Sequence, residues 1–293
     1  MENDEASPTP SSAGLILVAT PIGNLADLSF RARDALAEAS LVLCEDTRVT
    51  SRLLARHSIS ATTLALHDHN EESEAPRLIA RLLAGERMAL VSDAGTPLVS
   101  DPGYRLVRAA IAAGVPVTAV PGPNAAVMAL TLSGLPPHPF LFHGFLPPKA
   151  AARTAEIRKL AAMEGAGLSA TLIFYEAPHR TAEALAALAE ILGTGRPAAV
   201  ARELTKRFEE VRRGTLGHLA EHYASHEARG EVVICVGPAP PPETSAESLD
   251  DALRAAMAQL SLRDAAAAVA EATGLPRKRV YARALELAAA GPR

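Results

Sequence analysis

The chain has 293 residues, of which 48% are hydrophobic and 21% charged, so it can bury a full core and is long enough for two domains. No apolar run reaches the roughly 18 residues of a membrane helix, and residues 1–14 are acidic where a secretory signal is basic, which favours the cytoplasm and excludes a membrane protein. With a net charge of -4, any contact with nucleic acid must come from a local basic patch.

The first half of the chain predicts a parallel sheet. Residues 1–13 are rich in Pro and Ser and are expected to be a disordered tail. Apolar runs then predict strands at 15–20, 41–44, 62–66, 88–92 and 115–120, each followed by a turn and, in most cases, an amphipathic helix. Five such units in about 120 residues indicate an α/β domain over 14–135, with helices on both faces of the sheet.

The stretch 88–103, MALVSDAGTPLVSDPG, is the most informative of these units. A short strand breaks into Asp93, Gly95 and Pro97, and a helix begins after Gly103. Because ligands of open α/β sheets bind at the carboxyl ends of the strands, this loop predicts a binding site. Similar loops at 21–24, 45–48 and 121–125 are expected at the same edge.

The second half predicts a smaller α/β domain and a helical module. Residues 133–149 contain five prolines and are interpreted as a linker to a second domain over 136–238. That domain has expected strands at 170–175, 198–202, 211–213 and 231–236, with mixed strand order. A Pro-rich linker at 239–245 leads to a module at 246–293, whose predicted helices at 248–260, 262–272 and 276–289 resemble a helix-turn-helix.

Several common sites are missing from the sequence. There is no GKS or GKT loop and no GxGxxG after a strand, so a phosphate-cradled nucleotide is not expected. CxxC and HExxH are also absent, and no metal is predicted. His218, His222 and His226 fall four apart and form either a metal face or, more commonly, a solvated one. Cys44 and Cys235 are expected to be buried free thiols.

Basic residues gather in two places. Arg202, Lys206, Arg207, Arg212 and Arg213 lie within twelve positions, interrupted by acids, as in many solvated surfaces. The last helix carries positive charges that would face phosphate in a helix-turn-helix: Arg277, Lys278, Arg279 and Arg283.

Six motifs, in this order, give the chain its family resemblance: VATPIGNLADLSFRARDAL, LVLCEDTR, VSDAGTPLVSDPG, VPGPNAA, FYEAPHR and RELTKRFEEVRRG. Over residues 15–238 the chain resembles the tetrapyrrole methylase fold family. The resemblance implies two α/β domains of the class III methyltransferase type, with S-adenosylmethionine bound in the cleft between them, and a homodimer. The motifs are most similar to members that methylate a cytidine 2′-hydroxyl of 16S ribosomal RNA in the small ribosomal subunit.

The resemblance also implies roles for residues at matching positions. Residues expected to bind S-adenosylmethionine are Pro21, Asp93, Ala94, Gly95, Thr96, Val99, Ser100, Pro121, Asn124, Ala125, Phe145, Leu146 and Tyr175. Phe145 or Tyr175 would stack on adenine. A base is expected to take the proton of the ribose hydroxyl, and the candidates are Asp46, Glu176, His179 and Lys206. Lys206 qualifies only if its pKa is depressed. RNA phosphates would contact Arg48, Arg180, Arg202 and Arg213, together with the basic last helix.

Two other functions stay open on the sequence. A tetrapyrrole C-methyltransferase would share the cofactor cleft but has no need of a basic helical module. The chain could instead be a DNA-binding regulator whose α/β part only senses a ligand, but the helix-turn-helix is the only feature that supports this interpretation.

Overall fold

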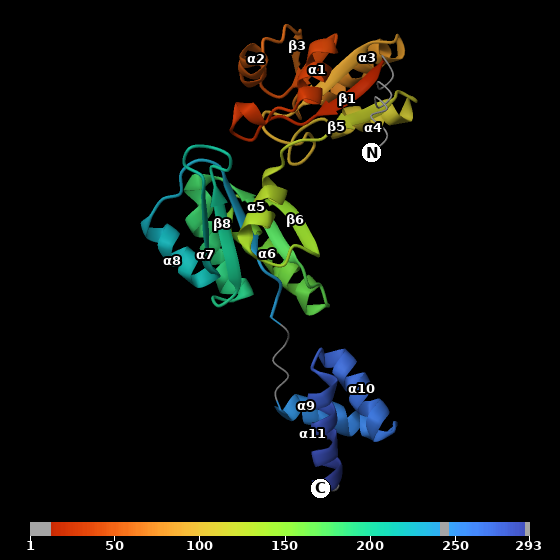
Figure 1. Ribbon diagram of the computed structural model, residues 1–293, viewed down its shortest axis with the longest axis vertical. Helices are drawn as coiled ribbons and strands as arrows, with labels where there is room; N and C mark the ends of the chain where they lie inside the picture. The colour runs from red at the N-terminus through yellow and green to blue at the C-terminus, as the bar shows by residue number, and fades with distance from the viewer. Residues whose placement is uncertain (1–12, 241–245, 291–293) are drawn as a thin grey trace, which may run out of the picture. The chain divides into compact units, whose positions relative to one another are not determined.

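The computed structural model describes residues 13–240 and 246–290 (Figure 1). Its contacts divide the chain into two compact units, Met1–Pro238 and Ala239–Arg293. The predicted tail and Pro-rich linker lie, except for residues 13, 239 and 240, outside the described residues. The proposed boundary between two α/β domains falls inside the first unit.

The first sheet contains the five predicted strands. β1 (Gly14–Val18), β2 (Leu41–Cys44), β3 (Thr63–Ala65), β4 (Arg87–Val91) and β5 (Val117–Val120) pair in the order β3-β2-β4-β1-β5. Every pairing in this sheet is parallel, so all five carboxyl ends lie on one edge. The loops expected to bind a ligand follow β1, β2, β4 and β5 and therefore share this edge.

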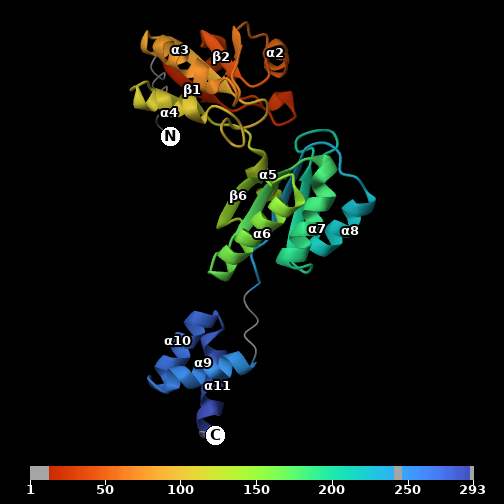
Figure 2. The same cartoon turned by 180° about the vertical axis from the view of Figure 1, so that it is seen from behind.

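Helices cover both faces of the first sheet. Alternate strand residues such as Ile16 and Ala89 pack with α1 (Phe30–Glu38) and α2 (Thr47–Arg56). Their neighbours, including Leu15 and Met88, pack on the other face with α3 (Glu71–Leu83) and α4 (Tyr104–Ala112), which lie side by side (Figure 2). Burial on both faces explains why the strands are apolar at nearly every position.

The second sheet has mixed order, as predicted. β6 (Phe140–Phe145), β7 (Thr171–Glu176), β8 (Pro197–Arg202), β9 (Glu210–Thr215) and β10 (Val232–Val236) pair in the order β6-β7-β10-β8-β9. Only β6 and β7 are parallel. One face packs with α6 (Ala150–Gly165), α7 (Thr181–Leu192) and α8 (Leu216–Ser225), and the other with α5 (Ala125–Ser133). Short 3-10 helices lie at Leu25–Asp27 and Pro178–Arg180.

The interpretation of 133–149 as a linker was wrong, because β6 forms the edge of the second sheet within it. All five prolines lie outside Phe140–Phe145, at 136, 137, 139, 147 and 148. Proline is tolerated next to an edge strand, which needs ladder hydrogen bonds on one side only. The strand predicted at 211–213 is also longer and spans Glu210–Thr215.

The C-terminal unit is a three-helix module, as predicted. α9 (Ala246–Met257), α10 (Leu262–Thr273) and α11 (Arg277–Ala290) share a small core that includes Leu253, Val269 and Val280. Gly274 ends α10 with a φ of +65°, a left-handed conformation that glycine adopts without strain, and so makes the tight turn before α11. In the part of the chain that the structure describes, no helix is both long and apolar enough to span a membrane.

Candidate active site

A cleft of about 400 Å³ lies in the first unit, between the carboxyl edge of the first sheet and the second sheet. Its volume falls within the usual range of small-molecule sites. The loop after β4 supplies one wall, and the ends of β6 and β7 with the start of β10 supply the other. The lining residues are Ile22, Asp93, Ala94, Gly95, Thr96, Val99, Ser100, Asp101, Ala125, Phe145, Tyr175, Glu176, Ala177, Pro178, Glu231, Val232 and Val233.

Three loops of the first sheet are fastened together at this cleft. Thr20 and Gly95 pair through two backbone hydrogen bonds, of 2.9 and 3.1 Å. The Thr96 hydroxyl donates to the Pro123 carbonyl at 3.0 Å, which joins the loop after β4 to the loop after β5. Gly95 has a φ of +91°, and a Cβ there would lie 3.2 Å from the Ile22 side chain. Glycine therefore lets the loops meet without strain.

Aromatic rings from the second sheet form an apolar wall. The rings of Phe145 and Tyr175 lie edge to face with centroids 5.7 Å apart, and Phe142 contacts Tyr175 at 4.9 Å. The Tyr175 hydroxyl accepts a hydrogen bond from the backbone N–H of Ala126 at 3.2 Å, so this ring is held in place. Such a wall suits a flat heterocycle.

Carboxylates give the cleft a negative character. Burial raises the pKa of Asp93, and burial together with the charges of Glu45 and Asp93 raises the pKa of Asp101 to about 7. Asp93 accepts a hydrogen bond from the Asp46 N–H at 3.0 Å. Within residues 13–240 and 246–290, neither Asp93 nor Asp101 forms an ion pair. Two partly buried carboxylates without a cation favour a positively charged ligand.

Most of the predicted cofactor residues meet in this cleft. Asp93, Ala94, Gly95, Thr96, Val99, Ser100, Ala125, Phe145 and Tyr175 line it, whereas Pro21, Pro121, Asn124 and Leu146 do not. Asn124 instead caps α5, because its Oδ1 accepts from the Val127 N–H. Asp101 and Glu231 were missed by sequence reasoning, although the Asp-Pro-Gly turn at 101–103 was a usable signal for Asp101.

The four candidate bases differ in their surroundings. Hydrogen bonds from Arg48 hold the pKa of Asp46 at about 2, which makes Asp46 a poor base. His179 lines a separate hollow beside Tyr223. Glu176 lines the cleft, and burial raises its pKa despite its ion pair with Arg180.

Lys206 does not meet the condition set by the sequence. Its Nζ lies 2.8 Å from Glu203 and 3.0 Å from Glu231. Burial favours the neutral amine, but these ion pairs outweigh it and raise the pKa of Lys206. The amine therefore stays protonated and helps to fix its loop.

Most of the predicted RNA-binding arginines already have partners in the protein. Arg180 donates to the Leu146 carbonyl, Arg213 donates to the Leu132 carbonyl, and Arg202 pairs with Glu210. Arg48 pairs with Asp46, yet its side chain is 84% exposed. In the C-terminal module, Arg283 makes a two-point ion pair with Asp250, which makes it less available to phosphate.

The basic N-terminal turn of α11 is exposed to solvent. Arg277, Lys278 and Arg279 are exposed and form no ion pair within the part of the chain that the structure describes, so they are available to phosphate.

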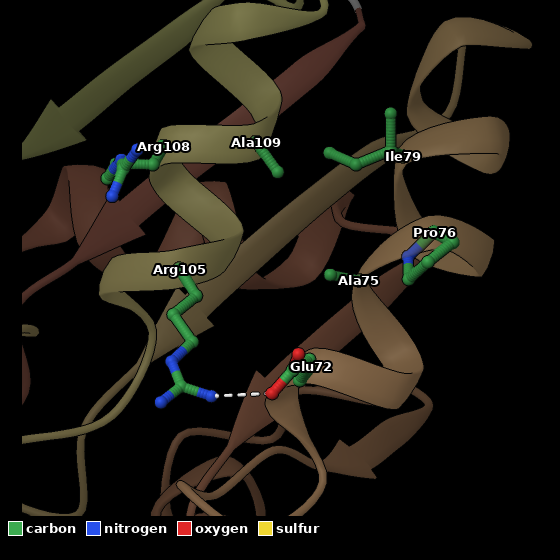
Figure 3. A pocket seen from close by; sticks show the side chains of 7 residues that line it. All are labelled: Glu72, Ala75, Pro76, Ile79, Arg105, Arg108 and Ala109. Atoms are coloured by element: carbon green, nitrogen blue, oxygen red, sulfur yellow. Dashed lines mark hydrogen bonds and ion pairs between the residues drawn. The ribbon is translucent and has the colours of Figure 1, made fainter.

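Other features fall outside the cleft. A shallow groove between α3 and α4, crossed by the Arg105–Glu72 ion pair, contains no predicted site residue (Figure 3). His222 and His226 stack at 4.5 Å, and among the residues described no three His, Cys, Asp or Glu side chains are grouped to hold a metal ion. Cys44 and Cys235 are free and buried, as predicted, and burial raises the pKa of Cys235 to about 12.

Comparison with known proteins gives matches over nearly the whole chain. The family model "Tetrapyrrole (Corrin/Porphyrin) Methylases" matches residues 14–220, and the model "RsmI C-terminal HTH domain" matches residues 243–288. A protein of Mesorhizobium japonicum named ribosomal RNA small subunit methyltransferase I is 50% identical over 95% of this chain and 93% of its own length. A Xylella fastidiosa protein of the same name is 50% identical over 91% of this chain and 97% of its own.

A solved structure supports the fold. Uroporphyrin-III C-methyltransferase from Thermus thermophilus, in complex with S-adenosyl homocysteine, superimposes with a TM-score of 0.52 at 20% identity. The match covers 76% of this chain and 96% of that one.

Proposed function

Since this chain belongs to the tetrapyrrole methylase family, we propose that it transfers a methyl group from S-adenosylmethionine to a cytidine 2′-hydroxyl of 16S ribosomal RNA in the small ribosomal subunit. The relatives that match nearly the whole chain are named ribosomal RNA small subunit methyltransferase I. We further propose which atom receives the methyl group and which residues bind the cofactor, accept the proton and bind RNA.

One observation carries the proposal: the cleft is suited to a cation that bears a flat heterocycle. S-adenosylmethionine has a sulfonium, an ammonium and an adenine. Asp93 and Asp101, which form no ion pair within the described residues, offer negative charge, and Phe145 and Tyr175 offer a surface for adenine. The Gly95 turn exposes backbone close to the ligand.

The reaction requires alignment and removal of one proton. S-adenosylmethionine, when bound, supplies an electrophilic methyl group on a sulfonium that an oxygen nucleophile displaces in line. The protein must hold the ribose 2′-oxygen beside that methyl group and accept its proton. Of the four candidate bases, Glu176 combines a place in the cleft with a raised pKa, so we assign the proton to its carboxylate.

The C-terminal module supplies the contact with RNA. Arg277, Lys278 and Arg279 lie together at the start of α11, on the second helix of the helix-turn-helix. Positive charge there binds phosphate without reading sequence, which suits a substrate whose target is selected in the cleft. We place the enzyme in the cytoplasm, acting as a homodimer.

The proposal is tested by methyl transfer from labelled S-adenosylmethionine to small ribosomal subunits, naked 16S RNA and uroporphyrinogen in parallel reactions. We expect label in ribosomal RNA, and in 2′-O-methylcytidine after digestion to nucleosides. Label only in uroporphyrinogen would instead support the tetrapyrrole C-methyltransferase. Label in a base-methylated nucleoside would refute the assignment of the 2′-oxygen.

A further inference from the structure

The loop at residues 203–209, between β8 and β9, carries an exposed aromatic ring that the proposed chemistry does not use. The Phe208 side chain is 65% exposed. The Arg207 guanidinium lies over this ring, 5.5 Å from its centroid. The ring is therefore accessible to a ligand at the surface of the protein.

The loop is held firmly, although its tip is exposed. Its Thr205 N–H donates to the Glu209 carboxylate at 2.7 Å, and the Thr205 hydroxyl accepts from the Asn24 N–H at 3.0 Å. Thr205 has a φ of +65°, which is rare for a β-branched residue and persists only where surrounding contacts impose it. The ring of Phe208 is therefore displayed on a rigid support.

Contacts of Leu204 and Lys206 place the loop at the rim of the cleft. Leu204 is buried against Ile22, which lines the cleft. Lys206 pairs with Glu231, which lines the cleft on the side of the second sheet. Arg207 and Phe208 follow Lys206 directly in the same loop.

We propose that Arg207 and Phe208 form a stacking platform for a nucleobase of the substrate RNA next to the methylated nucleotide. The inference rests on the proposed function. Proteins recognise unstacked RNA bases by stacking them on aromatic rings and arginine planes, and the neighbouring phosphate favours a nearby cation. Phe208 stacks on the RNA base, and Arg207 packs over the Phe208 ring and attracts the neighbouring RNA phosphate.

The test replaces the ring in the full-length chain and measures kinetics with small ribosomal subunits. Phe208→Leu is expected to raise KM for the subunit by about tenfold or more, with kcat and the affinity for S-adenosylmethionine little changed. Phe208→Trp keeps a stacking face and is expected to restore KM. Tyr104→Leu is the matched control, because Tyr104 is 61% exposed and lies under Arg108 at 5.7 Å on α4.

Fluorescence gives a second readout. The chain contains no tryptophan, so Phe208→Trp introduces a single reporter. Single-stranded polycytidylate at low salt is expected to quench its emission more than that of Tyr104→Trp. Equal quenching of the two variants would overturn the platform.

The outcomes separate this inference from the function on which it rests. If the wild-type chain does not methylate ribosomal RNA, the proposed function fails. If it does, and Phe208→Leu keeps the wild-type KM, only the platform is refuted. A change in sedimentation of Phe208→Leu at unchanged KM would also refute it and would identify Phe208 as a contact between copies of the chain.

Discussion

Replacing Gly95 by alanine tests whether the convergence of the loops determines cofactor binding. An alanine at the observed φ of +91° costs about 1–2 kcal/mol, and its Cβ would press on Ile22 from 3.2 Å. The strain is relieved by moving the loop, which breaks its two hydrogen bonds to Thr20. If binding must restore the native loop at a cost of about 1.4 kcal/mol, the Kd for S-adenosylmethionine rises about tenfold.

Gly85→Ala provides a matched control. Gly85 has a φ of +94°, but a Cβ there would meet no atom within 4 Å. It precedes β4, at the opposite end of the strand from the cleft. Both variants are expected to lower Tm by a few degrees, whereas only Gly95→Ala is expected to weaken binding measured by titration calorimetry. Equal affinities in the two variants would show that the convergence of the loops at Gly95 does not determine cofactor binding.

Three further predictions concern charge. Glu164→Gln is expected to cost about 3–5 kcal/mol in urea unfolding, because it leaves Arg196, which is 2% exposed, without its buried carboxylate. The affinity for S-adenosylmethionine is expected to fall as the pH is lowered from 8 to 6, because Asp101, whose pKa is about 7, loses its negative charge on protonation. The Asp101→Asn variant is expected to show a weaker dependence of affinity on pH. RNA binding is expected to lose about one unit of salt slope for each charge removed by substituting alanine for Arg277, Lys278 or Arg279.

Each of these has a contradicting result. A change below about 1 kcal/mol for Glu164→Gln would show that the pair is not effectively buried. An affinity that keeps the same pH dependence in Asp101→Asn would remove Asp101 from the binding of the cation. An unchanged salt slope would remove α11 from the RNA interface.

The first sheet could be predicted because its strands and turns are marked by residues that are close together in the sequence. Runs such as Leu41–Cys44 are apolar at every position, and the turns after them contain Gly, Pro or acidic residues, so strand and loop were both evident. β6 was not predictable in the same way. Its ring-bearing residues Phe140, Phe142 and Phe145 stand among prolines, and only the tertiary contact with β7 makes them a strand.

The position of the candidate cleft could be predicted from the sequence, but the hydrogen bonds and ion pairs of the charged residues could not. The loop at 92–103 was expected at the sheet edge, and most of its named residues line the cleft. Sequence could not show that Arg213 is held by the Leu132 carbonyl, 81 positions away, or that Arg283 is held by Asp250. Partners far away in the sequence determine which charged side chains are available to a ligand, and the periodicity of the sequence does not identify those partners.

The most direct test is a crystal structure of the chain grown with S-adenosylhomocysteine. We expect one molecule in the cleft, with its amino-acid end beside Gly95 and Asp101 and its adenine against Phe145 or Tyr175. Density for the ligand elsewhere, with the cleft closed by protein, would contradict it.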